Sequence, residues 1–271
     1  MRSKTNVVKH LTESAITPGA LTVAGYDPSS GAGITADLEV FTAHGVPGVS
    51  AVTALTVQSS RLVTRVEPVS ARLLKETLDL LADDQEIGGV KIGMLANDEL
   101  VAVVTGFLRQ RGIRRDRIVL DPVIKASSGA ELLSADGVRR VREELLRVVG
   151  WVTPNVVEAG ILAGVQGVDR AGVPGVARHI AELGSVLGSG LNVVVTGGHL
   201  ETPDDFLLTA EGEEVWFPGQ RVEARGIHGT HGTGCVFSSA LLCRLMRGDG
   251  KVEAVRRAKE FVVSRLQGIS Q

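Results

Sequence analysis

The sequence contains little cysteine and few aromatic residues. Its 271 residues include two cysteines, and Phe, Trp and Tyr together make up 3% of the chain. Two thiols in a chain of this length do not form a disulfide framework, so we expect both to be free and the protein to work in a reducing compartment, the cytoplasm. So few aromatic side chains also leave few surfaces on which nucleic-acid bases could stack.

A strong net charge and long apolar runs are missing as well. Lys and Arg total 29 and Asp and Glu total 31, a formal net charge of −2 with no basic excess that would favour nucleic acid. The longest weakly polar run, residues 45–57, is shorter than the about 20 apolar residues that a membrane span needs. The first nineteen residues lack the apolar segment of a secretory signal. We therefore expect a small-molecule partner, with no nucleic acid and no membrane.

Short apolar runs alternate with longer segments of helical period. Strands are predicted at 20–25, 49–57, 89–95, 117–123 and 191–198, and helices at 34–45, 71–84, 98–112, 134–150, 233–247 and 251–267. The strands are apolar on both sides, which is typical of buried parallel strands. The alternation predicts an α/β fold in which helices cover both faces of a mainly parallel sheet. Segments 204–210 and 214–219 predict a small β-hairpin at the sheet edge.

We expect one domain over residues 20–271, because no linker, repeat or low-complexity segment divides this part of the chain. Residues 1–19 are interpreted as a loosely ordered N-terminal extension. In an open parallel sheet, ligands bind beyond the carboxyl ends of the strands. The loops that directly follow the predicted strands are therefore the candidate functional segments.

The first such loop is AGYDPSSGAG, residues 24–33. It is neither a dinucleotide-binding pattern nor a Walker A sequence, since no Lys follows the glycines, and a tight turn alone would also require glycine. Asp37 lies one turn into the next helix, and Gln58 ends the second strand. Both residues could contact a ligand. A carboxylate stabilised by the helix dipole explains Asp37 equally well, and ordinary turn chemistry explains Gln58.

Two further loops place carboxylates at the same edge of the sheet. Asp121 lies at the carboxyl end of a strand, where it suits a metal or nucleotide site or an ordinary loop aspartate. In residues 151–162, a short apolar strand is predicted before Pro154 and the start of a helix, where Asn155 and Glu158 are three residues apart. This spacing indicates a capping box, and it also places a carboxylate where it could hold hydrated Mg²⁺ beside phosphates.

The fourth loop, GTHGTGC, covers residues 229–235 and precedes a segment of helical period. Gly232, Thr233 and Gly234 permit a tight approach to a helix N-terminus, whose N–H groups bind anions. A thiol in the first turn feels the positive end of the dipole, so we expect a lowered pKa for Cys235, which could then accept a proton. Cys243 is expected to be a small buried side chain.

Two histidines precede Cys235. The pattern H-x-x-H-x-x-x-C, which begins with His228 and His231, resembles part of a zinc site, but no fourth ligand follows nearby. We interpret His231 as a residue that orders the loop or faces phosphate. His199 and the remaining histidines are interpreted as surface or loop-packing residues.

Seven segments, taken in order, carry a family resemblance. They are AGYDPSSGAGITADLEVFTAHGV, AVTALTVQ, KIGML, LDPV, TPNVVEA, TGGHL and THGTGC, and they span about residues 20–245. The set resembles the hydroxymethylpyrimidine and phosphomethylpyrimidine kinases of thiamine biosynthesis, in the ribokinase-like superfamily. The resemblance implies a three-layer α/β/α sandwich, usually a homodimer. It also implies ATP- and Mg²⁺-dependent phosphorylation of 4-amino-5-hydroxymethyl-2-methylpyrimidine, and then of its monophosphate.

The resemblance also implies roles for individual residues. Asp37 and Gln58 would hydrogen-bond the aminopyrimidine, with Gly25 and Met94 lining its pocket. Cys235 would be the base that deprotonates the hydroxymethyl group. The anion hole would consist of Gly232, Thr233, Gly234 and Cys235. The nucleotide and Mg²⁺ region would contain Asp121, Asn155, Thr196, Gly198, His231 and Glu158, with Glu158 acting on the metal largely through water.

Two positions depart from the family pattern. Thr196 stands where the strand before GGH usually carries a lysine, and Ser127 stands where the pattern DPVM-x-A-K-S-G has one. Lys125 lies two positions earlier, on what we expect to be a differently facing side of the loop. Since both family lysines face phosphates, two alternatives stay open. One is a kinase for another small alcohol such as pyridoxal, and the other is a pyrimidine-binding regulator with weak or no kinase activity.

Overall fold

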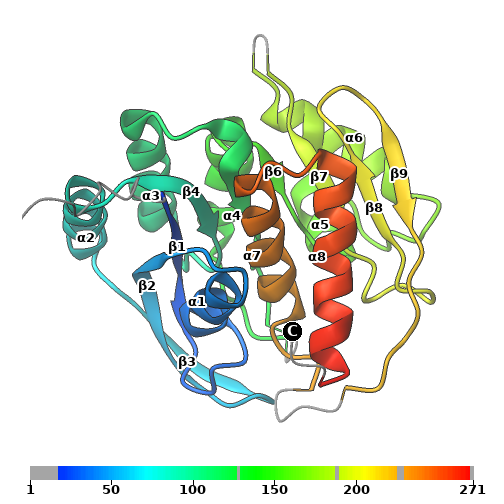
Figure 1. The fold of residues 1–271 in the computed structure, drawn as a ribbon, viewed down its shortest axis with the longest axis horizontal. Helices are drawn as coiled ribbons and strands as arrows, with labels where there is room; N and C mark the ends of the chain where they lie inside the picture. The colour runs from blue at the N-terminus through cyan, green and yellow to red at the C-terminus, as the bar shows by residue number, and fades with distance from the viewer. Residues whose placement is uncertain (1–17, 127–128, 187–188, 225–228, 269–271) are drawn as a thin grey trace, which may run out of the picture.

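The computed structural model describes residues 18–126, 129–186, 189–224 and 229–268. The predicted N-terminal extension therefore lies almost wholly outside the described residues. Figure 1 shows one continuous sheet with helices packed against both of its faces. The predicted α/β class and the three-layer sandwich are confirmed.

In the described residues, nine strands form one sheet in the order β3-β2-β1-β4-β5-β6-β7-β8-β9. The adjacent strands β2, β1, β4, β5, β6 and β7 are parallel to one another. Strand β3 at one edge and strands β8 and β9 at the other edge pair antiparallel with their neighbours. The strands are β1 (Gly19–Tyr26), β2 (Gly48–Gln58), β3 (Val63–Pro68), β4 (Ile87–Ile92), β5 (Ile118–Leu120), β6 (Trp151–Val152), β7 (Asn192–Val195), β8 (Asp205–Leu208) and β9 (Glu214–Phe217).

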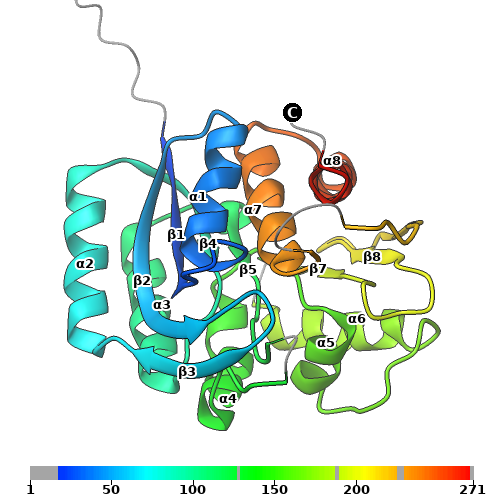
Figure 2. The ribbon, with the colours of Figure 1, turned by 90° about the horizontal axis from the view of Figure 1, so that it is seen from below.

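The helices form two outer layers, with α1, α7 and α8 on one face of the sheet and α2 to α6 on the other (Figure 2). They are α1 (Gly33–Ala43), α2 (Ala71–Asp84), α3 (Asp98–Arg111), α4 (Ala135–Glu143), α5 (Val156–Ala163), α6 (Val173–Gly184), α7 (Thr233–Met246) and α8 (Lys251–Leu266). Within the ranges that the structure describes, none of them combines the length and the apolar composition of a membrane span.

Side chains of the central strands point alternately into two cores. In β7, Val193 and Val195 pack beneath α2 to α6, whereas Val194 packs beneath α1, α7 and α8. Burial on both faces explains why these strands are nearly continuous apolar runs in the sequence. Lys91 in β4 breaks the pattern, because it is a fully buried lysine in a strand that we expected to be apolar on both sides.

Three elements differ from the sequence-based prediction, while the predicted hairpin is confirmed as β8 and β9. Strand β3 and helix α6 were not predicted, because β3 is a largely exposed edge strand and α6 begins in a segment rich in Gly and Pro. The single helix predicted over 134–150 ends at Glu143 and is followed by a 3₁₀ turn over residues 145–147. Local backbone geometry at Glu144, with φ of −125°, ends the α-helix there.

Candidate active site

A pocket of about 230 Å³ opens where the loops after the central strands meet the N-terminus of α7. Every residue assigned to the site from the sequence lines it, except Asp37. These residues are Gly25, Gln58, Met94, Asp121, Asn155, Glu158, Thr196, Gly198, His231, Gly232, Thr233, Gly234 and Cys235. The fold therefore brings together loops that are far apart in the sequence, while the role of each residue stays a prediction.

Two glycines allow the loops around the pocket to approach closely. Gly232, the residue before α7, has φ of 76°, and a Cβ on it would lie 1.9 Å from the carbonyl oxygen of Gly31. Gly33 has φ of 63°, and a Cβ on it would lie 2.3 Å from the carbonyl oxygen of Gly25. Backbone therefore packs against backbone within the β1–α1 connection at Gly33, and between that connection and the loop before α7 at Gly232. The first turn of α7, with N–H groups that lack intrahelical partners, is held at the pocket wall and favours an anion there.

Cys235 lies in the first turn of α7 and lines the pocket. We expected the helix N-terminus to lower the pKa of this thiol, and that expectation is wrong for the ligand-free protein. Burial raises the pKa of Cys235 to about 12, and although Lys91 acts in the opposite direction, Asp121 and Asp37 add to the increase. Desolvation disfavours the thiolate more strongly than the positive charge nearby favours it. At neutral pH the ligand-free protein therefore holds a protonated thiol.

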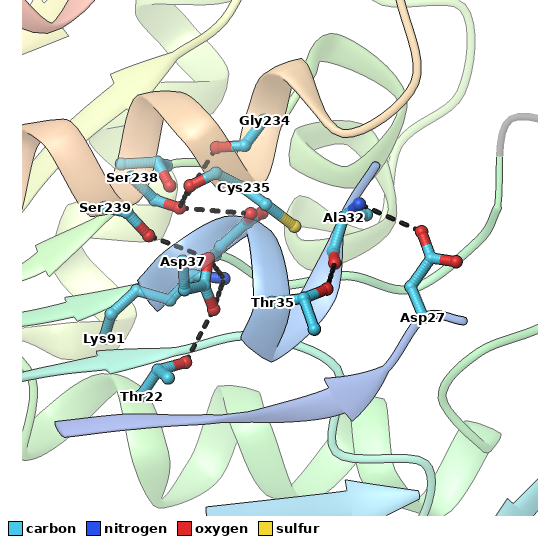
Figure 3. Close-up of polar contacts among 12 residues, drawn as sticks. Thr22, Asp27, Ala32, Thr35, Asp37, Lys91, Gly234, Cys235, Ser238 and Ser239 are labelled. Carbon is cyan, nitrogen blue, oxygen red and sulfur yellow. Dashed lines mark hydrogen bonds and ion pairs between the residues drawn. The ribbon is translucent and has the colours of Figure 1, made fainter. Parts of the chain in front are cut away.

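Asp37 does not reach the pocket, which corrects its assignment to the pyrimidine. Its carboxylate is fully buried in α1 and accepts hydrogen bonds from Thr22 at 2.6 Å and from Ser239 at 2.8 Å (Figure 3). The Nζ of Lys91 lies 2.8 and 2.9 Å from its two oxygens. The protein's own donors therefore occupy this carboxylate, and the fold keeps it beneath the site.

Lys91 is a component of this site region that the sequence-based assignment missed. It reaches from β4 into the layer that contains α1 and α7, and its side chain is fully buried. Burial alone would lower the pKa of Lys91, but the negative charges of Asp37, Cys235 and Asp121 raise it above its ordinary value. The lysine is therefore charged. A lysine inside the apolar run of KIGML was the signal that could have identified it.

Asp121 lies between this buried network and the pocket. It lines the pocket while only 4% exposed, and one of its oxygens accepts a hydrogen bond from Ser238 of α7 at 3.3 Å. Burial raises the pKa of Asp121, opposed by the ammonium of Lys91. Gly234 faces the same carboxylate, since a Cβ on it would lie 3.7 Å from Asp121 Oδ2. The carboxylate therefore borders the proposed anion hole.

Asn155 and Glu158 form the capping box that their spacing predicted. The Asn155 side chain accepts from the Glu158 N–H at 3.0 Å, and Glu158 accepts from the Asn155 N–H at 3.0 Å and from the Ile124 N–H at 3.3 Å. Burial, with Asp121 nearby, raises the pKa of Glu158 to about 8. Because backbone donors already occupy both carboxylate oxygens, Glu158 suits a metal-bound water better than direct coordination.

Asp27 and His231 join the two glycine-rich loops. The Nε2 of His231 lies 2.8 Å from Asp27 Oδ2, and the same carboxylate accepts from the N–H groups of Ser29 and Ala32 at 2.8 and 2.9 Å. Burial opposes ionisation of Asp27, but hydrogen bonds from His231, Gln58 and Ser29 hold its pKa below the ordinary value. His231 therefore orders the loop, as one of our two interpretations predicted. Asp27 belongs to the loop of residues 24–33 but was not assigned to the site from the sequence.

The remaining wall of the pocket includes residues from β7 and from the loop after β5. Thr196 pairs with Asn155 in an isolated parallel bridge, and Gly198 and His199 follow it along the wall. Lys125 also lines the pocket, although the sequence suggested that it faces elsewhere. Ser127, the second departure from the family pattern, lies outside the described residues. His199 is exposed, as its interpretation as a surface residue predicted, and it also lines the pocket.

The zinc alternative receives no support from the described part of the chain. Among those residues no group of three His, Cys, Asp or Glu side chains is placed to hold a metal ion. His228, which the zinc pattern required, lies outside them. Cys235 and Cys243 are both free, and Cys243 is buried as expected.

Comparison with known sequences agrees with the motif-based resemblance. A family model described as phosphomethylpyrimidine kinase matches residues 27–270. A protein from Aquifex aeolicus is 37% identical over 249 residues, which cover 92% of this chain and 94% of the relative. One from Rhizobium meliloti is 39% identical over 245 residues, covering 90% and 88%. Both are named hydroxymethylpyrimidine/phosphomethylpyrimidine kinase.

Solved structures give the same fold. The phosphomethylpyrimidine kinase of Clostridium difficile superposes with a TM-score of 0.76 at 29% identity, covering 90% of this chain and 97% of that one. A pyridoxal kinase from Staphylococcus aureus, in complex with pyridoxal, gives 0.79 at 26% identity, covering 92% and 88%. Fold similarity thus does not separate the two kinds of vitamin kinase, whereas the sequence relatives named above share one name.

Removing the buried ammonium should destabilise the fold. Lys91→Met leaves the Asp37 carboxylate buried without its cation, and we expect a loss of about 3–5 kcal/mol in the free energy of unfolding. In the matched double variant Asp37→Asn/Lys91→Met neither charge remains, so it should be more stable than Lys91→Met alone. Urea denaturation of wild type, the single variant and the double variant measures their free energies of unfolding. A Lys91→Met protein as stable as wild type would contradict the description of the pair.

The raised pKa of the Cys235 thiol can be measured by alkylation. In a Cys243→Ala background, we expect the rate of reaction with iodoacetamide to keep rising with pH beyond 9, because the thiolate fraction stays small until the pKa near 12. When the same protein is unfolded in urea, the rate of alkylation should level off above about pH 8.5–9, the ordinary pKa range of a thiol. A plateau of the folded protein below pH 8 would instead restore the low pKa that the sequence suggested.

Proposed function

The chain belongs to the phosphomethylpyrimidine kinase family, and from this membership we propose that it phosphorylates 4-amino-5-hydroxymethyl-2-methylpyrimidine with ATP. A second phosphorylation, of the monophosphate, gives the diphosphate used in thiamine synthesis. The observation that carries the proposal is the convergence in one pocket of Gln58, the anion-binding start of α7 and the thiol of Cys235. These features supply a ring-binding wall, a phosphate-binding wall and a proton acceptor.

We assign the apolar part of the pocket wall, around Met94, to the pyrimidine ring. A Cβ on Gly25 would lie 2.6 Å from Met94 Cε, so the glycine leaves room for the methionine against the β1 strand end. Met94 clusters with Ala54 and Leu132, which suits the face of a flat ring. Gln58 lines the same pocket, and the carbonyl oxygen of its amide can accept a hydrogen bond from the exocyclic amino group of the ring.

The phosphate end relies on fixed dipoles. Phosphoryl transfer requires in-line positioning and compensation of charge on the transferred group, with little covalent chemistry for the protein. The N–H groups at the start of α7 supply this compensation without reorganisation. A base is needed for the hydroxymethyl proton. Cys235 can act as this base only as a thiolate, which the ammonium of Lys91 favours against the opposing effect of burial.

The residues present fit Mg²⁺. Asp121 and Glu158 offer oxygen atoms on the pocket wall, the donor type that this ion prefers, and Glu158 would hold it through water because its own oxygens accept backbone N–H groups. The bound ion would neutralise charge on the phosphates of ATP. Asn155 positions Glu158 through the capping box and lies on the same wall.

The activity is tested by its products. Purified protein is incubated with ATP and Mg²⁺ and with either the hydroxymethylpyrimidine or pyridoxal, and mono- and diphosphates are followed by mass spectrometry. We expect phosphate on the pyrimidine in both steps. Faster reaction with pyridoxal would favour that alternative, which the fold similarity to pyridoxal kinases keeps relevant. Tight pyrimidine binding without any product would favour a regulator.

Cys235→Ala should lower turnover by about 10²–10⁴-fold, the range for loss of a general base. Pyrimidine affinity should change little, since the thiol is proposed to contact the hydroxymethyl group while Gln58 and Met94 hold the ring. Cys243→Ala removes the other thiol, in the buried core, and serves as the matched control. Steady-state kinetics and calorimetric binding separate the two effects. Cys235→Ala turning over at the wild-type rate would remove the thiol from the mechanism.

We also propose that the protein is a homodimer. Leu55 and Val57 of β2, with Leu62 and Tyr26 beside them, are large apolar side chains that are 54%, 51%, 54% and 37% exposed. Leu55 and Val57 are two residues apart in the strand and so share one face of the sheet, next to the β3 edge. Large apolar side chains exposed together on one strand favour an interaction site.

Sedimentation equilibrium should give about twice the mass of one chain. The double variant Leu55→Glu/Val57→Glu should give the monomer, because burying two carboxylates at an apolar interface is unfavourable. Leu80→Glu places one carboxylate on α2, at a leucine that is 71% exposed, and should leave the dimer intact. A wild-type protein that sediments as a monomer at micromolar concentration would refute the proposal.

Location in the cytoplasm and a single kinase domain over residues 20–271 complete the proposal. Both cysteines are free, which suits a reducing compartment. The described strands from β1 to β9 join one sheet, which is consistent with one domain.

A further inference from the structure

Lys125 differs from the other lysines of the described chain. Each of the others has a carboxylate partner, in the pairs Lys75–Asp79, Lys91–Asp37, Lys251–Glu211 and Lys259–Asp205. Across residues 18–126, 129–186, 189–224 and 229–268, no ion pair involves Lys125, which is exposed and lines the pocket. Its ammonium is therefore available to an anionic ligand.

Backbone hydrogen bonds fix the direction of Lys125. Leu132 donates to the Ile124 carbonyl at 2.8 Å and Ala126 donates to the Ala130 carbonyl at 2.9 Å, so residues 124–126 form an extended segment of a small hairpin. Ile124 is 3% exposed and packs in the core. Because neighbouring side chains of an extended segment point to opposite sides, Lys125 points away from the core. The expectation that it faces elsewhere than the pocket is therefore wrong.

Lys125 stands between two parts of the pocket. On one side, Ala126 packs with Met94 and Leu132, the apolar patch proposed for the pyrimidine ring. On the other side, the N–H of Ile124 donates to Glu158 at 3.3 Å, which places the lysine next to the wall that bears the carboxylates. A phosphate that extends from the ring toward this wall meets carboxyl oxygens, so a cation between them and the phosphate is favourable.

We propose that Lys125 binds a phosphate group in this pocket, supplying the charge that Thr196 and Ser127 do not. The phosphate is either the one carried by the pyrimidine monophosphate or the one transferred from ATP. An ammonium is a compact, movable point charge that suits phosphate from a loop. The inference rests on the proposed kinase function for its pyrimidine ligand, but its nucleotide arm does not depend on the pyrimidine.

Binding to the ligand-free protein tests the proposal by calorimetry. Three probes are compared: the hydroxymethylpyrimidine, its monophosphate and AMP-PCP. Lys125→Ala should weaken binding of one phosphorylated probe by about 10–100-fold, the usual effect of losing a charge-assisted hydrogen bond. Affinity for the unphosphorylated pyrimidine should change less than about twofold, and Lys125→Arg should bind the phosphorylated probe nearly as well as wild type.

The pattern of losses identifies the source of the phosphate. A loss confined to the monophosphate, with a raised KM in the second phosphorylation only, assigns Lys125 to the pyrimidine monophosphate. A loss confined to AMP-PCP, with both phosphorylation steps slowed alike, assigns it to the transferred group. Arg61, the other long cation on the pocket wall, supplies the matched control Arg61→Ala.

Three results would overturn the proposal. One is equal affinity of wild type and Lys125→Ala for both phosphorylated probes. Another is a loss that extends equally to the unphosphorylated pyrimidine, which indicates a structural role. The third is a loss in Arg61→Ala that Lys125→Ala does not show. If wild type binds AMP-PCP but no pyrimidine, the proposed substrate fails, while the nucleotide arm still decides the role of Lys125.

Discussion

The site depends on a buried ion pair that does not line the pocket. Lys91 and Asp37 join β4 to α1, and the same carboxylate accepts from Thr22 of β1 and Ser239 of α7 (Figure 3). A buried pair of this kind contributes little net stability compared with an apolar pair of similar volume, but losing one partner is costly. The pair matters because it fixes the position of the helices and because it places the ammonium of Lys91 beneath the site. Ser239 is one turn after Cys235 on α7, so this network sets the helix at the depth where the thiol meets the pocket.

The pocket wall is fixed by backbone contacts as much as by side chains. Gly232 and Gly31 pack at a distance that no Cβ allows, and the pair of His231 with Asp27 holds the same two loops together. Fixed N–H dipoles stabilise transferred charge because they need not reorient during the reaction. The rigidity of these loops and the depth of α7 are therefore two parts of one arrangement, which aims the start of the helix into the pocket.

The fold and most of the pocket wall could be predicted from the sequence, because both follow local rules. Apolar periodicity identified the central strands, and loops after parallel strands necessarily meet at one edge. Asp37 and Cys235 show where such rules end. Their environments depend on Lys91, which lies 54 residues from Asp37 in the sequence, and no local pattern pairs the two. Desolvation likewise comes from the packing of several elements, so the pKa of Cys235 followed burial rather than its place at a helix N-terminus.

The distribution of positive charge explains how such a site can tolerate the loss of lysines at fixed positions. A cation at a strand end, such as the one that Thr196 replaces, acts at close range in a dry environment, whereas an exposed lysine on a loop acts through water and is screened. A positive charge on Lys125, instead of at the end of the strand, therefore attracts phosphate more weakly. The amides of α7 are unaffected by that exchange, since they belong to the backbone. If the proposed function holds, these amides would carry the larger share of phosphate binding, and the loop lysine would add selectivity for where the phosphate lies.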